Sequence, residues 1–416
     1  MRQSLLFLKT QRQPPKDETF SNAQLLEQAG YIHKLSAGVY SLLPLGLRVI
    51  NNIARIIRKE MNAMGGQELF MPALHPLENY IQTGRDKIDV LFHLETVAGK
   101  KMVLGQSHEE VITPLAQRYI SSYRDLPLSL YQIQVKFRNE LRAKSGILRG
   151  REFMMKDLYS FHRDEEDLDQ YYEKMKAAYF RIFDRAGLGD VTHITYASGG
   201  SFSKYSHEFQ TITDAGEDTI HVCPKCGVAV NQELLHEQST CPECNHSKLD
   251  MKKSIEVGNI FKLKTKFSGA FKLSYVDEQG GARLVQMGCY GIGLGRLMGT
   301  IAEIHHDQRG LVWPKSVTPY QVHLLCLSER TATVQMANDI YESLVKCGVD
   351  VLYDNRQESA GIKLKDADLL GISIRLVIGE KTGQKVEIKF RDQSGIELVE
   401  TDELIKTINQ HYCEGV

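Results

Sequence analysis

The sequence lacks the long apolar runs that membrane-spanning helices require. None of its apolar runs approaches the roughly 18 residues that a spanning helix needs. The short apolar patch near the N-terminus also lacks the small-residue cleavage site of a signal peptide. These two absences argue against a membrane protein or a secreted one, so we expect a cytoplasmic protein. Internal repeats and low-complexity tracts are missing too, and a length of 416 residues suits about two or three domains.

The sequence also lacks a cysteine pattern typical of a disulfide framework. Two CxxC pairs account for four of its eight cysteines. This distribution suits a reducing compartment and a single metal site better than paired disulfides. The other four cysteines are scattered along the chain: Cys289, Cys326, Cys347 and Cys413.

The two CxxC pairs predict a structural zinc ribbon. Gly227 and Asn245 each follow the second cysteine of a pair, and both residue types tolerate positive φ, so backbone N–H groups can turn toward sulfur. Four thiolates leave no open coordination position, so the metal would stabilise the fold and not catalyse. A redox pair and an empty, degenerate site are the alternatives. The expected ligands are Cys223, Cys226, Cys241 and Cys244.

Charge of one sign is not in excess overall, since the net charge is −1, yet one stretch is strongly basic. Between Lys136 and Arg163, eight Lys/Arg residues stand against three Asp/Glu residues. Alternation over residues 131–137 and 152–161 predicts two strands joined by a turn that contains Ser and Gly. Guanidinium groups pair bidentately with phosphate oxygens, so the hairpin is a candidate site for a polyphosphate or a nucleic acid. A solvated charged hairpin is the alternative.

The spacing within this hairpin resembles motif 2 of the class II aminoacyl-tRNA synthetases. The resemblance rests on residues 137–140 (FRNE) and on the series Arg149, Phe153 and Asp157 at intervals of four. It implies that Arg138 holds the α-phosphate of ATP and the carboxylate of the amino acid. It further implies that Glu140 accepts from the adenine amino group or orients the tRNA end, Phe153 stacks on adenine, and Arg149 reaches the γ-phosphate. Preorganised cations of this kind stabilise the charge that spreads over an attacked phosphate.

Residues 46–64 are predicted to form an amphipathic helix. Its apolar residues recur at intervals of three and four, and it is followed by Gly65-Gly66 and a predicted strand over residues 67–72. This order resembles motif 1 of the same class, which implies a homodimer interface whose apolar stripe needs cover. An ordinary core helix is the alternative. Further helices are predicted over residues 21–29 and 164–186.

Residues 104–113, LGQSHEEVIT, are similar to the loop LGPTHEEVIT of prolyl-tRNA synthetases. The resemblance implies that Ser107 and Glu109 hold the prolyl imino group, whose two N–H donors suit a hydroxyl and a carboxylate. The pair Gln106-Ser107 departs from the family's Pro-Thr. A helix N-terminus, with Ser107 as cap and Glu110 completing a capping box, is a second interpretation compatible with the first. The later stretch SHEF places Glu208 either in the same pocket or on the surface.

Residues 288–296, GCYGIGLGR, are predicted to run from a strand into a helix. A GxGxG series alone is weak evidence of a nucleotide site. Because no βαβ pattern precedes it and an arginine follows it, the stretch resembles class II motif 3. The resemblance implies that Arg296 binds the γ-phosphate and that Cys289 lies at the proline pocket. Upstream of this stretch, a strand is predicted over residues 270–278. Two residues before it depart from the family pattern, since Lys264 replaces a glycine and Phe267 replaces a tyrosine.

The C-terminal part alternates strands and helices after a proline-containing linker, which predicts a small α/β domain. The stretch DNRQESAGIKLKDADLLG resembles the anticodon-binding domain of the prolyl, threonyl, histidyl and glycyl enzymes, although Ser359-Ala360 replace Arg-Pro. Residues 318–416 contain 11 Lys/Arg and 16 Asp/Glu. This balance favours a few placed contacts with tRNA over loose electrostatic binding.

Together the motifs predict an α+β protein with an antiparallel-sheet class II catalytic domain. Its expected activity is to join ATP and proline into prolyl-adenylate and to transfer the prolyl group to tRNA(Pro), with Mg²⁺ implied by the polyphosphate chemistry. A threonyl or glycyl sister enzyme and an inactive tRNA-binding paralogue are the alternatives. The intact Arg138, Glu140 and Arg296 argue against the latter. The expected parts are the core in residues 1–218 and 253–314, the zinc ribbon in residues 219–252 and the anticodon-binding domain in residues 318–416.

One part found in many bacterial members of this family is not expected here. Many of them carry a large editing domain between motifs 2 and 3. Only about 90 residues separate Arg163 from Ser254, and the ribbon takes about a third of them, whereas an independent domain needs roughly 100 or more. We therefore expect no editing within this chain.

Overall fold

The computed structural model describes residues 1–413 except 17, 142 and 144. Residues 142 and 144 belong to the turn of the basic hairpin, so that part of the turn lies outside the described residues. The chain divides into two compact units. Unit 1 comprises Met1–Leu35, Ser41–Ile53 and Ile301–Val416, and unit 2 comprises Ser36–Tyr40 and Ala54–Thr300. The domain boundaries expected from the sequence stay a prediction.

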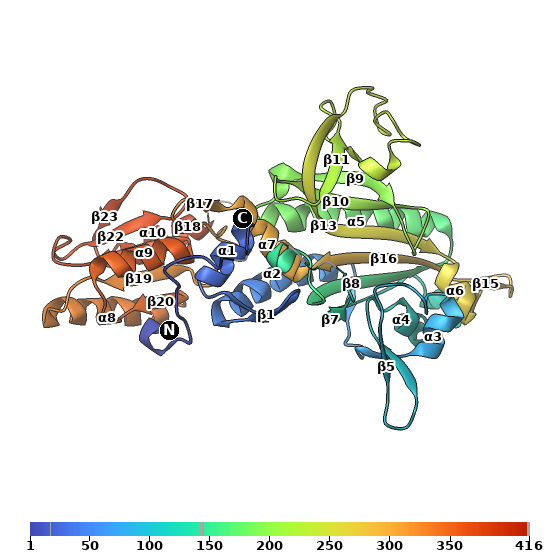
Figure 1. Cartoon of the computed structure of the whole chain (residues 1–416), viewed down its shortest axis with the longest axis horizontal. Helices are drawn as coiled ribbons and strands as arrows, with labels where there is room; N and C mark the ends of the chain where they lie inside the picture. Colours follow the sequence, from blue (N-terminus) through green and yellow to red (C-terminus); the bar gives the residue numbers. More distant parts are fainter. Residues whose placement is uncertain (17, 142, 144, 414–416) are drawn as a thin grey trace. The chain divides into compact units, whose positions relative to one another are not determined.

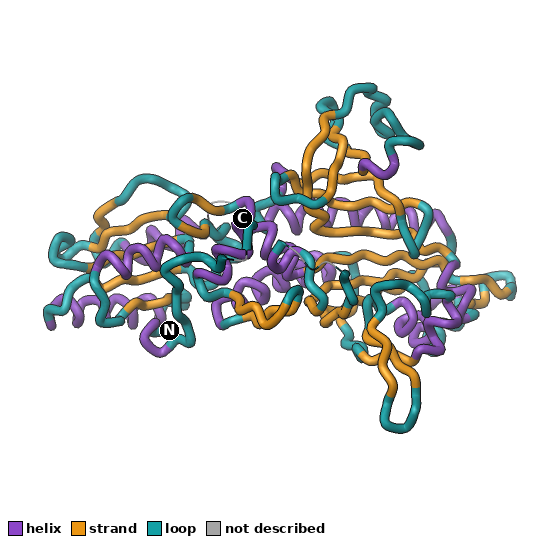
Figure 2. Tube along the Cα trace, in the orientation of Figure 1, coloured by secondary structure: helices purple, strands orange, loops and turns teal. Residues whose placement is uncertain are grey.

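Unit 2 is built on a nine-stranded sheet, which confirms the predicted fold class (Figures 1 and 2). The strand order is β10-β9-β12-β11-β13-β16-β8-β7-β3, and β10 also pairs with β13. The pairs β7/β8, β8/β16 and β16/β13 are antiparallel, and the first of them is the predicted basic hairpin. The bounds are β3 Gln67–Glu68, β7 Leu128–Phe137, β8 Glu152–His162, β9 Thr192–Ser198, β10 Tyr205–Ile212, β11 Asp218–Val222, β12 Ala229–Asn231, β13 Asp250–Lys264 and β16 Gln286–Gly293.

Helix α5, Glu165–Arg185, packs on strands β8, β13 and β16 of this sheet. Its N-cap Asp164 accepts a hydrogen bond from the backbone N–H of Asp167, and the first turn is acidic, which favours the helix dipole. The predicted helix over residues 164–186 is thus confirmed. Its buried face consists of Leu168, Tyr172, Met175, Ala178, Tyr179, Ile182 and Phe183.

Shorter elements of unit 2 surround helix α4 in the sequence, and α3 and α6 both contact it. They include a three-stranded sheet of order β4-β6-β5. The bounds are β4 Leu74–Pro76, α3 Leu77–Thr83, β5 Phe92–Glu95, β6 Lys101–Leu104, α4 Glu109–Ala116, α6 Lys266–Phe271, β14 Ser274–Val276 and β15 Ala282–Leu284. The strand predicted over residues 270–278 is therefore shortened, because helix α6 extends to Phe271. Lys264 adopts a φ of 50°, the left-handed conformation that a glycine accepts more readily.

Helix α2, Pro44–Ala63, corrects one expectation about the dimer. Four of the five residues of its predicted apolar stripe, Ile50, Ile53, Ile57 and Met61, are 0–1% exposed, whereas Leu47 is 45% exposed. Most of the stripe therefore does not need a partner subunit for cover. The strand expected over residues 67–72 is also shorter, because only Gln67–Glu68 pairs with β7, in parallel.

Unit 1 contains a five-stranded mixed sheet of order β20-β19-β21-β22-β23, which confirms the predicted C-terminal α/β fold. Its apolar core lies between this sheet and α8 and α10, and includes Val322, Leu344 and Ile408. The bounds are β19 Val322–Cys326, α8 Thr331–Lys346, β20 Val351–Asp354, α9 Ala360–Leu370, β21 Ile374–Ile378, β22 Val386–Phe390, β23 Glu397–Val399 and α10 Leu404–Cys413. Helix α1 is Ser21–Gln28, β1 and β2 are Ile32–Ser36 and Val39–Leu42, α7 is Leu294–Ile304, and β17 and β18 are His306–Asp307 and Gly310–Leu311. No helix in the described part of the chain is both long and apolar enough to cross a bilayer.

Candidate active site

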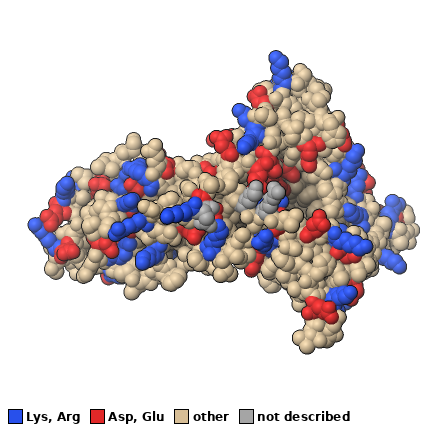
Figure 3. Space-filling model, in the orientation of Figure 1, with Lys and Arg blue, Asp and Glu red and all other residues tan. Residues whose placement is uncertain are grey.

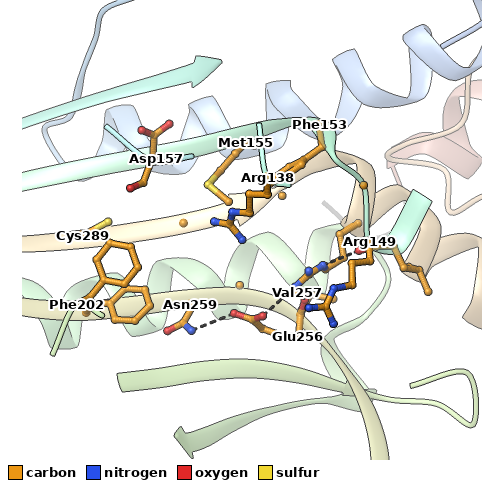
Figure 4. Close-up of a pocket in the computed structure, with 18 of the residues that line it drawn as sticks. Arg138, Arg149, Phe153, Met155, Asp157, Phe202, Glu256, Val257, Asn259 and Cys289 are labelled. Atoms are coloured by element: carbon orange, nitrogen blue, oxygen red, sulfur yellow. Dashed lines mark hydrogen bonds and ion pairs between the residues drawn. The ribbon is translucent and has the colours of Figure 1, made fainter. Parts of the chain in front are cut away.

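A cavity of about 200 Å³ opens on the sheet of unit 2 (Figure 4). Strands β7, β8, β13 and β16 and the loop before α4 contribute to its lining. Eight of the nine residues expected to bind ATP or proline line it: Ser107, Glu109, Arg138, Glu140, Arg149, Phe153, Cys289 and Arg296. The ninth, Glu208, lies elsewhere.

The alternation of strand β8 explains why its side chains converge on this cavity. Phe153, Met155, Asp157 and Tyr159 all line it, as residues two apart on one face of a strand must. Strand β16 pairs with β8 and places Gly291 opposite Asp157. Glycine adds no side chain to the floor, which leaves the sheet surface open to a ligand.

One end of the cavity is cationic. Arg138 lies between the Arg149 end and the Cys289 end in Figure 4, and its guanidinium group is 5.3 Å from the Phe153 ring centroid. The Nε atom of Arg138 is buried and has no hydrogen-bond partner among the described residues. Burial, and then repulsion by Arg296, lower the pKa of Arg138. An anion bound between these two cations would relieve the repulsion.

The other two basic side chains are held by carboxylates and carbonyls. Arg296 donates from Nη1 to Glu256 Oε2 at 2.8 Å and from Nε to the carbonyl of Leu148 at 2.8 Å. Arg149 donates from Nη2 to Glu140 Oε2 at 2.9 Å. These partners fix the direction of both guanidinium groups before any ligand binds.

The opposite end of the cavity carries a carboxylate, a hydroxyl and a thiol. The thiol of Cys289 donates to Glu109 Oε1 at 3.2 Å, and both residues are buried. Burial, and then the Glu109 charge, raise the pKa of Cys289, so the group stays a thiol. Ser107 Oγ accepts from Gln106 Nε2 at 2.7 Å. The residue that departs from the family pattern, Gln106, thus contacts the hydroxyl directly.

The expected capping box before α4 is wrong. The N-cap of α4 is His108, which makes no side-chain cap hydrogen bond, and not Ser107. Glu110 Oε1 instead accepts from Arg85 Nη1 at 2.9 Å and from Thr83 Oγ1 at 3.0 Å. Side-chain contacts across the fold therefore outcompete the local cap.

A buried polar network below the amino-acid end was not predicted. Lys136 Nζ lies 2.8 Å from Asp157 Oδ1 and 2.8 Å from His108 Nδ1. Tyr159 donates from its hydroxyl to Asp157 Oδ2 at 2.8 Å and accepts from the backbone N–H of His108 at 2.9 Å. Burial, and then Lys136, lower the pKa of His108 to about 3, so its ring is neutral. This network fastens the loop before α4 to strands β7 and β8.

Glu208 lines a second cavity of about 330 Å³. The two cavities share six lining residues: Arg138, Glu140, Leu148, Arg149, Glu256 and Arg296. Glu208 accepts from Gln210 at 2.8 Å and from Asn231 at 3.2 Å. Burial, and then Glu256, raise the pKa of Glu208 to about 8. Acidic side chains gather at the hollow on this face (Figure 3), and those lining the cavity are Glu140, Glu208, Glu217, Asp218, Glu233 and Glu256. Glu208 is thus not beside Ser107 and Glu109, and its proline-binding role stays a prediction.

The four CxxC sulfurs lie together, all within 4.8 Å of one another. The Sγ–Sγ distances include 3.4, 3.5 and 3.7 Å, which are far too long for disulfides. They are close to the roughly 3.8 Å edge of a tetrahedron with Zn–S bonds of about 2.3 Å. Gly227 and Asn245 have positive φ, as expected for knuckles. The donor set therefore fits a structural zinc ion.

Comparison with known proteins identifies the family. A model described as tRNA synthetase class II core domain (G, H, P, S and T) matches residues 92–305, and one described as anticodon binding domain matches residues 321–411. A proline--tRNA ligase of Dehalococcoides mccartyi is 34% identical over 561 aligned positions, covering 98% of each chain. The chain belongs to the proline--tRNA ligase family. Another member, from a Geobacillus species, is 33% identical and covers 99% of each chain.

The family fold extends to distant members. A crystal structure of prolyl-tRNA synthetase from Cryptosporidium parvum, complexed with halofuginone and AMPPNP, superposes with a TM-score of 0.77 at 17% identity. The match covers 94% of this chain and 77% of that one. The alignment with the family member from Dehalococcoides mccartyi spans 561 positions, at least 145 more than this chain has residues. At least 145 positions of that alignment therefore have no residue of this chain.

Proposed function

We propose that the chain activates proline with ATP to give prolyl-adenylate and then transfers the prolyl group to the 3′ end of tRNA(Pro). One observation carries this proposal. A single cavity joins a cationic end, suited to a polyphosphate, to an end with a carboxylate and a hydroxyl, suited to a secondary ammonium. This chemistry is the one that a proline--tRNA ligase needs, which is the name of the family members to which this chain is similar. The threonyl, glycyl and inactive alternatives are not favoured.

The geometry supports a direct displacement at the α-phosphate. A carboxylate oxygen of proline attacks phosphorus, the new C–O–P linkage forms, and the bond to pyrophosphate breaks. Arg138 lies between the two ends of the cavity, where it can hold both the proline carboxylate and the α-phosphate. Arg149 and Arg296 would hold the departing pyrophosphate, and Phe153 would offer its ring to adenine.

The amino-acid end carries a buried carboxylate with which a prolyl cation would pair. Glu109 and Glu110 are adjacent and buried, and both carboxylates pair with Arg85. A secondary ammonium with two N–H donors can bind here by donating to Glu109 and, in place of Gln106 Nε2, to Ser107 Oγ.

Mg²⁺ would supply charge neutralisation of the polyphosphate. Glu256 lines both cavities and offers the hard carboxylate oxygens that this ion prefers. The four cysteines would hold zinc as a structural ion. Homodimerisation and a cytoplasmic location complete the proposal. Residues 321–411 would read the tRNA anticodon.

The proposal includes the absence of editing within this chain. Between His162 and Asp250 the described residues form α5, strands β9 to β12 and the cysteine knuckles, and the strands belong to the main sheet. This arrangement supports a chain that has no separate hydrolytic domain between these residues.

The test is ATP–pyrophosphate exchange measured with each of the twenty amino acids. Proline should support exchange, alanine should support it weakly, and the other amino acids should not. Exchange that depends on threonine or glycine would favour a sister enzyme, and no exchange with any amino acid would favour an inactive paralogue.

A further inference from the structure

Arg85 is a buried cation directly behind the amino-acid end of the cavity. It follows helix α3, its exposure is 3%, and it does not line the cavity itself. Its Nη1 atom lies 2.9 Å from Glu110 Oε1 and 3.4 Å from Glu109 Oε2. Its Nη2 atom donates to Ser107 Oγ at 3.3 Å. One guanidinium group therefore contacts both side chains that we assign to the prolyl imino group.

The electrostatics of this cluster depend on Arg85. Glu109 and Glu110 are 0% exposed, and Arg85 is the cation in contact with both of them among the described residues. Burial raises the pKa of Glu110 to about 7, and Arg85 acts against that rise. Removing one partner of a buried ion pair leaves an uncompensated charge, which is a severe loss.

Two aromatic rings lie close to the guanidinium group. Its Cζ atom lies 4.4 Å from the ring centroid of Phe202 and 5.4 Å from that of Phe267. A planar guanidinium can stack on rings while it donates along its edge, whereas the compact ammonium of lysine cannot do both. Phe202 also lines the cavity, so the stack connects Arg85 to a second wall of the amino-acid end.

We propose that Arg85 is the positioning residue of the amino-acid site, fixing Ser107 and Glu109 in the geometry that receives the imino group. It acts through these two side chains and does not touch the substrate. The inference rests on the proposed function, because it assigns Ser107 and Glu109 to proline. Sequence reasoning missed Arg85 because no motif surrounds it.

The test separates positioning from simple charge neutralisation with four variants: Arg85→Lys, Arg85→Gln, Glu110→Gln and the double variant Arg85→Gln/Glu110→Gln. Arg283→Gln is the matched control, since this exposed arginine pairs with Asp277 on a surface hairpin of the same unit. ATP–pyrophosphate exchange gives KM for proline and for ATP and kcat, and thermal unfolding gives Tm.

Arg85→Gln should raise KM for proline about 10- to 100-fold, the range typical when a partner that orients a binding side chain is removed. KM for ATP should change less than about twofold. Arg85→Lys should still have a raised KM for proline, because lysine carries the same charge as arginine but lacks the planar set of guanidinium donors. The double variant should regain Tm by removing the unpaired charge but should keep the raised proline KM.

Two results would overturn the inference. A wild-type proline KM in the double variant would mean that Arg85 only neutralises Glu110. An equal rise of KM for proline and KM for ATP in Arg85→Gln would mean a general structural defect. These failures are distinct from failure of the proposed function, which would show as no proline-dependent exchange in the wild-type protein.

Discussion

The thiol of Cys289 donates a hydrogen bond to Oε1 of Glu109 at 3.2 Å, although 180 positions separate the two residues in the chain. Glu109 begins helix α4, and Cys289 lies on strand β16. The contact therefore joins the loop assigned to the imino group to the strand of the third class II motif. Cys289 occupies one of the acceptor sites of the carboxylate and leaves Oε2 facing Arg85. A ligand cation entering this end meets a carboxylate that is already oriented.

Arg138→Ala should nearly abolish adenylate formation. The substitution would remove the bidentate phosphate contact proposed for Arg138, a loss of about 3 kcal/mol or more in the transition state, or roughly 100-fold in kcat/KM. ATP–pyrophosphate exchange with proline measures it, with Arg283→Gln as the control. Wild-type exchange in Arg138→Ala would refute the assignment of the second motif.

Freshly purified protein should contain one zinc ion per chain by elemental analysis. Cys223→Ser should lose the ion and lower Tm, because metal binding contributes directly to folding of the ribbon. Adenylation should survive in the folded fraction, since none of the four ligand cysteines lines the cavity. Cys347→Ser is the control, because this exposed thiol lies far along the chain, at the end of α8. A zinc content near zero in the wild-type protein would reject the ribbon as a metal site.

The protein should sediment as a homodimer, with about twice the 47.1 kDa chain mass, at micromolar concentration. The resemblance of residues 46–72 to the first class II motif supports this expectation. Phe70 is 76% exposed at the end of this stretch and offers an apolar contact that the buried stripe of α2 does not. Phe70→Ser should weaken the dimer, and Leu398→Ser, which changes an exposed leucine of unit 1, should not. A wild-type monomer would contradict the prediction.

Lys156 should make stability rise with pH. Its Nζ donates to Tyr179 Oη at 2.6 Å and to the carbonyl of Tyr290 at 3.0 Å, and burial lowers its pKa to about 7. An unfolded lysine titrates near about 10.4, so the unfolded chain binds more protons between roughly pH 7 and 10. In that window the wild type should gain stability relative to Lys156→Met, by at most about 1.4 kcal/mol per pH unit. Denaturant unfolding of both proteins from pH 6 to 10 measures the difference. A difference that does not depend on pH would contradict it.

The enzyme should activate alanine at a detectable rate and should not hydrolyse the resulting Ala-tRNA. A pocket rejects a substrate that lacks methylene groups by only about 1–3 kcal/mol for each missing group. Preformed Ala-tRNA(Pro), incubated with purified protein, should decay at its spontaneous rate. Faster deacylation, in a preparation free of other hydrolases, would show that editing occurs in this chain after all.

The sequence by itself determined much of the local structure. Alternation at two residues predicted the hairpin of β7 and β8, and acidic residues at the start and arginines at the end of residues 164–186 predicted α5. The resemblance to the class II motifs selected the eight side chains that line one cavity, and the CxxC spacing selected the four cysteines that meet. The predictions of the hairpin and of each CxxC pair succeeded because residues on one strand face, or in one short turn, are placed by the local backbone alone.

Only the tertiary structure decided the contacts between segments that are distant in the chain. It placed Arg85 behind Glu109 and Glu110, gave Glu110 to that arginine and not to a capping box, and put Glu208 in the second cavity. It also covered most of the apolar stripe of α2 within the chain. Such outcomes depend on sheet register and on competition among buried polar partners, where an unpaired group costs more than a local hydrogen bond gains. No local pattern in the sequence encodes that competition, so the backbone period fixed which residues share a face and the packing fixed which partners they meet.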